Sequence, residues 1–304
     1  MQRILVIKHG AFGDVIQCDG ALRDIRAHHP GDEIVVLTTP AYAKIFRRCP
    51  HVDRVLIDPR APRWRLDRMS ALRNELRREA FARVYDLQNS ARTAFYFRWF
   101  LKDVEWSGTA AGCALPHRAD DPKKIRTLDR LAGQLRDAGV PVIQTLAPDV
   151  GWMADDVMAL LANVRRPYVV LVPGSSARHP QKRWPHYAAL AHALMEAGFD
   201  VVTAPGPDET GPDLPGHVLR GTGFIDWFQL AGVMTAAAFV IGNDTGPTHL
   251  ASHLGGRGLA LFGSHMPAER TGILRAGFGA IEVKDVQTLS VARVWDEVRT
   301  RLGE

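Results

Sequence analysis

Short runs of apolar, mostly β-branched residues alternate along the chain with segments long enough to be helices. The runs cover residues 4–7, 34–37, 52–57 and 84–87 in the first half, and residues 168–172, 199–203, 239–241 and 259–262 in the second. Strands that are apolar on both faces are typical of a parallel sheet covered by helices on either side. The pattern therefore predicts an α/β fold that occurs twice.

Helix-period spacing accounts for several segments between these runs. From Val15 to His29, apolar positions recur every three or four residues, which predicts one amphipathic helix. The same spacing over residues 128–138 predicts a helix that stops before Gly139. Residues 140–150 hold two prolines and show neither an apolar strand run nor helix-period spacing. We therefore expect two domains, residues 1–150 and 151–304.

Charge is divided unevenly between the two halves. The chain has 38 Lys and Arg against 33 Asp and Glu, a net charge of +5. Residues 1–140 hold 25 basic and 17 acidic side chains, a net of +8, whereas residues 141–304 have a net of −3. The first half is therefore expected to bind an acidic partner. The opposite sign of the second half argues against a general nucleic-acid binder.

Cysteine content and hydropathy indicate a protein of a reducing compartment. The three cysteines, Cys18, Cys49 and Cys113, are odd in number and widely spaced, so neither a disulfide framework nor a zinc site is indicated. The run at residues 4–7 is far shorter than a signal-peptide core, and no run approaches the ~18 residues of a membrane span. We expect a cytoplasmic protein with at most peripheral contact at the inner membrane.

Polar segments follow several predicted strands, at the edge where open α/β sheets bind ligands. The first of these segments contains Lys8, Gly10, Gly13 and Asp14. Its glycines allow a sharp turn, and Asp14 falls near the start of the next helix, where a carboxylate either caps the helix or acts as a general base. The segment is neither a Walker loop nor a GxGxxG fingerprint.

Two segments of the second half have the composition of a phosphate and ribose site. Residues 173–185 combine small and hydroxyl residues with cations, which favours a phosphate, although a solvated basic loop has the same composition. Their candidates are Ser175, Ser176 and Lys182. In residues 204–210, a carboxylate can hold ribose hydroxyls or only shape a turn; the candidates are Asp208 and Glu209.

The segment after residues 239–241 predicts a helix N-terminus open to an anion. Asp244 or Thr245 caps this helix, and Pro247 lies in its first turn, where a missing N–H costs no bond. Gly246 lets a ligand approach the positive end of the helix dipole. His249, one turn further, points back to that end, although a lone helical histidine is more often a packing residue.

Two kinds of motif are missing from the sequence. It has no Asp-x-Asp, no HExxH and no His/Cys cluster, so no motif for a divalent metal is present. Residues 221–226 resemble a dinucleotide fingerprint but lack its third glycine and lie late in the chain. If a diphosphate leaves during a reaction at this site, it would have to be stabilised by backbone amides, by Lys182 and by a helix dipole, because no metal motif is present.

Taken in order, these segments resemble glycosyltransferase family 9, the ADP-heptose:lipopolysaccharide heptosyltransferases. The resemblance covers nearly the whole chain, and its most specific part is the late motif. It rests on Gly13-Asp14, Lys182-Arg183-Trp184-Pro185 and Asp244-Thr245-Gly246-Pro247-Thr248-His249, with smaller matches at Asp86, Gln88, Arg92 and residues 261–263 before Pro267.

The resemblance implies a GT-B architecture, in which two Rossmann-like parallel-sheet domains face each other across a cleft. The first domain would bind the acceptor and the second the nucleotide sugar, with the last helix able to pack back on the first domain. Transfer would be inverting and free of metal or other cofactor, with Asp14 as general base and Lys182 neutralising the diphosphate. Donor contacts would come from Ser175, Ser176, Glu209, Asp244, Thr245, Gly246 and His249. Acceptor contacts are expected from Gly13. The basic surplus of the first half adds Arg60, Arg63, Lys123 and Lys124, which could meet phosphorylated inner-core sugars or an anionic membrane face.

The chain departs from the family pattern at two places. Residues 17–20 read Gln-Cys-Asp-Gly where the family has a proline and small apolar residues, and Ser264 and His265 stand where Thr-Asp is frequent. These departures bear on the acceptor and on the exact sugar. We expect a monomer that binds a nucleotide sugar and an anionic glycolipid.

Three other functions remain as alternatives. A sugar-nucleotide epimerase of similar fold would need further acid/base groups at the sugar, which no motif supplies. An NAD(P)-dependent oxidoreductase would need the fingerprint glycines after the first strand. A non-catalytic binder of anionic glycans or surfaces would use the Arg-rich residues 60–83, although such charge runs usually form one solvated helix face.

Overall fold

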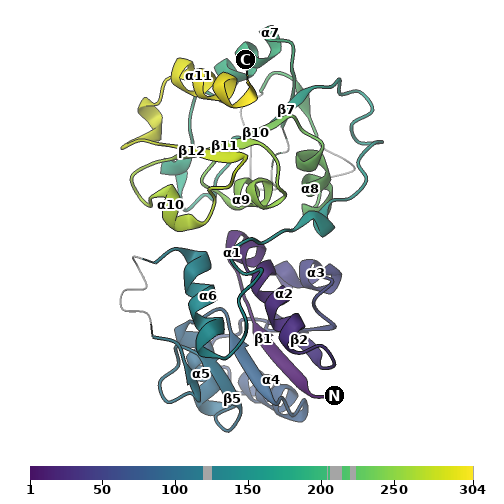
Figure 1. Cartoon of the computed structure of the whole chain (residues 1–304), viewed down its shortest axis with the longest axis vertical. Helices are drawn as coiled ribbons and strands as arrows, with labels where there is room; N and C mark the ends of the chain where they lie inside the picture. The colour runs from purple at the N-terminus through teal and green to yellow at the C-terminus, as the bar shows by residue number, and fades with distance from the viewer. Residues whose placement is uncertain (119–124, 204, 206–213, 220–223, 304) are drawn as a thin grey trace. The chain divides into compact units, whose positions relative to one another are not determined.

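The computed structural model describes residues 1–118, 125–203, 205, 214–219 and 224–303. The chain forms two compact units, residues 1–148 and residues 149–304. Each unit contains a six-stranded sheet whose strand pairs are all parallel. Figure 1 shows helices packed around the strands of each unit. The predicted α/β class and its occurrence in both halves are confirmed.

The first sheet has the strand order β3-β2-β1-β4-β5-β6. Its strands are β1 (Arg3–Ile7), β2 (Glu33–Thr38), β3 (Arg54–Ile57), β4 (Arg83–Asp86), β5 (Glu105–Gly108) and β6 (Leu115–Pro116). The helices of this unit are α1 (Phe12–Gln17), α2 (Asp19–His28), α3 (Pro40–Arg48), α4 (Leu66–Arg78), α5 (Ala91–Trp99) and α6 (Thr127–Asp137).

The core of the first unit follows from the two-residue period of its strands. Leu5 and Ile7 of β1 pack in one cluster with side chains of α4 and α5, among them Leu72 and Tyr96. The intervening Val6 is also fully buried, so the opposite face of the sheet is covered as well. Burial on both faces explains why β1 reads as a continuous apolar run.

The second sheet has the strand order β12-β11-β10-β7-β8-β9. Its strands are β7 (Tyr168–Val172), β8 (Asp200–Thr203), β9 (His217–Val218), β10 (Phe239–Asn243), β11 (Gly258–Phe262) and β12 (Phe278–Glu282). Its α-helices are α7 (Tyr187–Glu196), α8 (Trp227–Thr235), α9 (Gly246–His253), α10 (Ala268–Thr271) and α11 (Val291–Leu302), and its 3₁₀ turns are η1 (Gly151–Met153), η2 (Pro180–Lys182) and η3 (Val286–Thr288).

Helix α11 contributes to the core of the second unit. Val294 and Val298 of α11 are fully buried in one cluster with Leu190 and Leu194 of α7 and with strand residues of this sheet. Figure 1 shows α11, in yellow, beside α7. The apolar stripe of the last helix is therefore used within the second unit. Among the described helices, none is long and apolar enough to cross a bilayer.

The helix predicted from Val15 to His29 is interrupted. It forms as α1 and α2, which meet at Cys18. The second residue of α2 is Gly20, and a Cβ built on it would lie only 2.3 Å from the carbonyl oxygen of Gln144. A larger residue would push this backbone away, so the glycine in the departure at residues 17–20 has a packing reason.

Asp24 ties the end of the first unit to α2. Its buried carboxylate accepts hydrogen bonds from the backbone N–H groups of Ile143 at 3.1 Å, Gln144 at 2.9 Å and Thr145 at 2.9 Å. The Thr145 hydroxyl donates another at 2.6 Å. One carboxylate therefore satisfies three successive amides in a segment without a strand partner.

Replacing Asp24 by alanine is expected to lower the free energy of unfolding by ~2 kcal/mol, because several buried donors would lose their acceptor. For a unit of this size, the midpoint of thermal unfolding should fall by about 4–8 °C. Calorimetry measures both quantities, and Asp103→Ala, at an exposed aspartate of the same unit, serves as the matched control. Equal midpoints in the two variants would contradict the anchoring role.

Candidate active site

Strand β1 ends in a turn whose backbone is fixed by its neighbours. The Lys8 ammonium is buried and donates to the carbonyl of Leu87 at 3.2 Å, and the N–H of His9 donates to the Gln88 side chain at 2.9 Å. Gly10 has a φ of +129°, and a Cβ there would lie 2.5 Å from the Tyr42 ring. Glycine is therefore required at this position by both conformation and space.

Asp14 lies at the third position of α1, with an intermediate exposure. The N-cap of this helix is Ala11, and the Ala11 N–H donates to Oδ2 of Asp14 at 3.2 Å. The carboxylate thus supports the helix start from inside the first turn rather than from the cap position. Its negative charge is also stabilised by the positive N-terminal end of the helix dipole. Gly13, the residue before it, is likewise partly exposed.

Asp86 shapes the neighbouring turn after β4. Its fully buried carboxylate accepts from the N–H groups of Gln88 at 3.1 Å and Asn89 at 2.9 Å. Burial raises the pKa of Asp86 to about 6, although these hydrogen bonds act in the opposite direction. Because Gln88 also receives the N–H of His9, this turn is coupled to the turn that precedes Asp14.

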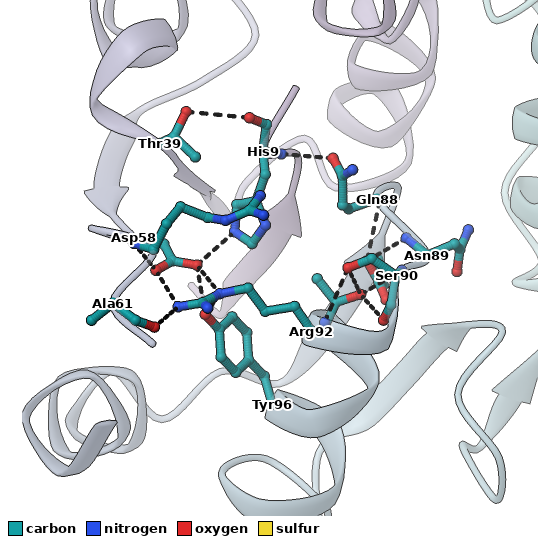
Figure 2. Close-up of polar contacts among 12 residues, drawn as sticks. His9, Thr39, Asp58, Ala61, Gln88, Asn89, Ser90, Arg92 and Tyr96 are labelled. Carbon is teal, nitrogen blue, oxygen red and sulfur yellow. Dashed lines mark hydrogen bonds and ion pairs between the residues drawn. The ribbon is translucent and has the colours of Figure 1, made fainter. Parts of the chain in front are cut away.

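A buried charge cluster follows β3. Asp58 accepts two hydrogen bonds from the Arg92 guanidinium, at 3.0 and 3.1 Å, and one from the Tyr96 hydroxyl at 2.5 Å. Figure 2 shows these three side chains pointing toward one another. Burial by itself would raise the pKa of Asp58, but the hydrogen bonds from Arg92 and Tyr96 hold it below its usual value. The cluster therefore stays charged at neutral pH.

His9 packs against this cluster as a neutral side chain. Its Nε2 lies 3.3 Å from Oδ2 of Asp58 without the alignment of a hydrogen bond, and neither ring nitrogen has a hydrogen-bond partner among the described residues. Burial lowers the pKa of His9 to about 4 despite the nearby carboxylate. Figure 2 shows the ring directed at Asp58.

The cluster holds the stem of the loop that carries Arg60 and Arg63. Asp58 accepts the Arg60 N–H at 2.7 Å, and Arg92 donates to the Ala61 carbonyl at 3.0 Å. Arg60 and Arg63 are themselves exposed. These two candidates therefore share one anchored loop, whereas Lys123 and Lys124 lie outside the described residues.

In the second unit, Asn243 at the end of β10 organises the loops around the site. Its Nδ2 donates to the carbonyl of Pro173 at 2.7 Å, and its Oδ1 accepts from the N–H of Trp184 and from the hydroxyl of Tyr187, both at 3.2 Å. The side chain is fully buried. One amide thus joins the loop after β7 to the segment that leads into α7.

The two serines of the loop after β7 have different environments. Ser175 is buried, donates to the carbonyl of His179 at 3.0 Å and accepts from Arg183 at 3.2 Å. Ser176 is exposed, and its hydroxyl accepts the Arg178 N–H at 3.3 Å. Ser175 therefore shapes the loop, and Ser176 is the serine open to solvent.

Lys182 and Asp244 form an ion pair across 62 residues of sequence. Nζ of Lys182 lies 2.6 Å from Oδ2 of Asp244 and 3.3 Å from its carbonyl oxygen. The Lys182 side chain is 20% exposed, and an ammonium has three N–H donors, so one donor remains for a ligand. The predicted phosphate lysine and the predicted sugar-contacting aspartate are thus direct neighbours.

Two histidines complete the environment of Asp244. Nε2 of His249 lies 3.3 Å from Oδ1, and Nε2 of His265 lies 2.7 Å from Oδ2. Burial alone would raise the pKa of Asp244, but hydrogen bonds from His249 and Lys182 hold it well below its usual range. The His265 ring stacks on Phe262 with an interplanar angle of 6°.

Helix α9 begins beside this group. Its N-cap is Thr245, with Pro247 in the first turn, as the sequence predicted. The Thr248 hydroxyl donates to the carbonyl of Asn243 at 2.6 Å, and a Cβ on Gly242 would approach that hydroxyl to 2.3 Å. Close packing at Gly242 therefore sets the helix start next to Asp244, with Thr245 and Gly246 partly exposed.

The ribose-binding carboxylate and a metal site were the two remaining questions for the candidate site. Glu209 and its alternative Asp208 lie outside the described residues, so the ribose-binding prediction is not placed. Within the described parts of the chain, no group of three or more His, Cys, Asp or Glu side chains has the arrangement of a metal site.

The family of the chain is shown by a comparison with protein-family models. The family model described as glycosyltransferase family 9 (heptosyltransferase) matches residues 69–290. The chain belongs to glycosyltransferase family 9. This family 9 chain is therefore a glycosyltransferase, and the predicted recognition and enzyme class are confirmed. It is 25% identical to lipopolysaccharide heptosyltransferase 2 of Escherichia coli K12, covering 87% of this chain and 84% of that protein.

Solved structures of similar fold include two family members. A family 9 glycosyltransferase of Veillonella parvula superposes with a TM-score of 0.81 at 19% identity, covering 99% of this chain and 97% of that one. The E. coli ADP-heptose lps heptosyltransferase II gives 0.76 at 20% identity, covering 99% and 98%. A more distant match, TM-score 0.56 at 13% identity, covers 91% of this chain and 61% of the iron-containing E. coli glycosyltransferase TibC.

The structure adds several residues to the neighbourhood of the candidate site. Asp58 follows a predicted strand, so the strand-end rule that nominated Asp14 and Asp244 was sufficient to nominate it too. His265 lies in residues 261–267, which close another predicted strand and are a weak signal by themselves, and it is also a departure from the family pattern. Asn243 lies in the segment predicted after residues 239–241, but its role was not predicted, and Tyr96 gave no signal, because a buried hydrogen bond leaves no local pattern in the sequence.

Proposed function

We propose that the chain transfers a heptose, or a related sugar, from an ADP-linked donor to an anionic saccharide acceptor of the lipopolysaccharide-core type, with inversion and without a metal. The proposal is supported by family membership, by the name of the E. coli relative and by the fold shared with the E. coli ADP-heptose lps heptosyltransferase II. The observation that carries it is the Lys182–Asp244–His249 group at the start of α9.

The second unit is proposed to bind the donor. The third N–H of Lys182, the amides at Thr245 and Gly246 and the dipole of α9 together favour a diphosphate. Asp244, kept ionised by its three partners, accepts hydrogen bonds from hydroxyl groups of the sugar. His249 positions this carboxylate through Oδ1. Ser176 adds a solvent-facing hydroxyl, and Ser175 supports the loop. The ribose contact is assigned to Glu209.

The first unit is proposed to bind the acceptor and to carry the base. An acceptor hydroxyl attacks the anomeric carbon, a C–O bond forms, and the bond from that carbon to the diphosphate oxygen breaks. The hydroxyl proton passes to Asp14, and the negative charge of the leaving diphosphate is received by Lys182 and the amides. Gly13, Arg60, Arg63, Lys123 and Lys124 are the proposed acceptor contacts.

A thermal-shift screen with ADP-, GDP-, UDP- and CDP-sugars and with NAD tests this function. An ADP-sugar is expected to raise the unfolding midpoint most, because a ligand that binds only the folded state stabilises it. Transfer to a lipopolysaccharide-core acceptor should persist in EDTA, since the proposed charge stabilisation uses protein groups. A UDP-sugar preference with epimer formation would indicate the epimerase, and activity restored only by an added metal would contradict the metal-free mechanism.

A further inference from the structure

The loop after β3 and the start of α4 expose two large apolar side chains. Trp64 is 79% exposed and Leu66 is 73% exposed. At the end of α5, Trp99 is 57% exposed. Scattered exposed apolar residues are common, so the informative question is whether these form one surface.

Contacts in this part of the first unit link the loop after β3 to Trp99. The Arg63 guanidinium lies 5.7 Å from the centre of the Phe95 ring, and Phe95 lies 6.4 Å from the ring of Trp99. Arg73 of α4 donates to the Trp99 carbonyl at 3.3 Å. Trp64 directly follows Arg63 in the chain. We call the exposed set the Trp64 surface; its residues are Arg60, Arg63, Trp64, Arg65, Leu66, Arg68, Arg98 and Trp99.

The Trp64 surface is strongly cationic. Residues 59–68 hold four arginines and one acid, Asp67, which pairs with Arg65 at 3.1 Å. In the described part of the chain, Arg60 and Arg63 form no ion pair with a carboxylate. The Arg98 guanidinium lies 5.5 Å from the centre of the Trp99 ring. Each exposed tryptophan thus stands beside an arginine with charge available for an anion.

The apolar residues of this surface are held in place. The stem of their loop is fixed by the Asp58–Arg92 cluster, and it contains Pro59 and Pro62, which restrict the backbone. The Arg65 N–H donates to the Pro62 carbonyl at 3.0 Å. The loop therefore presents Trp64 on an anchored backbone instead of leaving it on an unrestrained segment.

We propose that the Trp64 surface docks on an anionic lipid bilayer, with Trp64 and Leu66 entering the interfacial layer and the arginines meeting lipid phosphates. Tryptophan beside arginine is the composition favoured at such interfaces, because the indole ring enters the headgroup layer while the cation is attracted to the anionic surface. A soluble polyanion would use the arginines and the rings but gives no reason for an exposed leucine beside them.

The inference deepens the proposed function, because an enzyme whose acceptor is a glycolipid must work at a membrane. It does not depend on catalysis for its test, since lipid binding is measured without donor or acceptor. It also places the lipid contact on the loop that carries the proposed acceptor arginines, Arg60 and Arg63. The bilayer and the anionic acceptor would thus be met by one face of the first unit.

Co-sedimentation with vesicles tests the proposal. The full chain is expected to bind phosphatidylcholine vesicles that contain phosphatidylglycerol and not vesicles of phosphatidylcholine alone, with weaker binding as salt rises. The double variant Trp64→Ser/Leu66→Ser should bind the anionic vesicles at least about tenfold more weakly. The matched control Ile143→Ser/Met158→Ser removes two apolar side chains that are 72% and 77% exposed elsewhere, and it should bind like the parent.

Three outcomes would overturn the inference: no binding to the anionic vesicles, equal loss in the control variant, or full binding by the Trp64→Ser/Leu66→Ser variant. A further assay uses a lipid-free saccharide acceptor, with which this variant should retain parental transfer. If the variant loses as much transfer to that soluble acceptor as to a lipid-linked one, Trp64 and Leu66 contact the sugar and not the lipid. Failure of ADP-sugar binding would instead count against the proposed function alone.

Discussion

Asp14→Asn is expected to lower the rate of sugar transfer by about 10²–10⁴-fold while leaving the affinity for the ADP-sugar unchanged. A general base contributes a factor of this size, and an amide cannot take up the proton of the attacking hydroxyl at neutral pH. The amide oxygen can still receive the Ala11 N–H, which is 3.2 Å from the carboxylate in the parent. The helix start should therefore survive, so the variant separates proton transfer from helix capping.

Single-turnover kinetics measure the rate of transfer, and calorimetry with ADP measures donor-site integrity. Asp103→Asn, which makes the same change at an exposed site, is expected to react at the parental rate. Parental turnover by Asp14→Asn would remove this residue from the role of base and leave it as a helix-capping residue.

Lys182→Met is expected to weaken ADP binding by about 10- to 100-fold, equivalent to about 1.5–3 kcal/mol for a hydrogen bond to a charged group. The loss arises because the ammonium supplies both the charge and the spare donor for the diphosphate. Asp244 keeps His249 and His265 as partners in this variant, at 3.3 and 2.7 Å, so the fold of the site should be retained.

Isothermal calorimetry with ADP gives the dissociation constants, and the unfolding midpoint checks that the variant is folded. Lys284→Met, at an exposed lysine of the same unit, is the matched control and should bind ADP like the parent. Lys182→Arg should recover part of the affinity, since it restores the charge with a different shape. If Lys182→Met binds ADP as tightly as the parent, the lysine does not contact the diphosphate.

The central strands of both sheets could be predicted from apolar runs, whereas β5, β6, β9 and β12 were missed. β6 and β9 have two residues each and lie at sheet edges, and β12 is also an edge strand. β5 reads Glu-Trp-Ser-Gly and has no apolar run. The two-residue strands are too short to hold an apolar run, and the buried residues of β5 are Trp106, Ser107 and Gly108, so their burial leaves no run of β-branched residues.

The candidate residues were selected because parallel sheets bind ligands at one edge. That rule nominated Asp14, Lys182, Asp244 and His249 from their positions near predicted strand ends. It could not reveal that Asp58 accepts hydrogen bonds from Arg92 and Tyr96, 34 and 38 residues further along the chain. Nor could it reveal that His265, noted as a departure, is a hydrogen-bond partner of Asp244.

The sequence alone determined the α/β class, the two-fold occurrence of the sheet, the family and the segments that carry the site. Which of those segments meet was decided by tertiary structure. Lys182 reaches Asp244 because β7 and β10 are neighbours in the sheet although β8 and β9 lie between them in the chain. Local patterns encode which residues a strand buries, but strand order depends on how the helices pack across the sheet, so this pairing follows only from the folded unit.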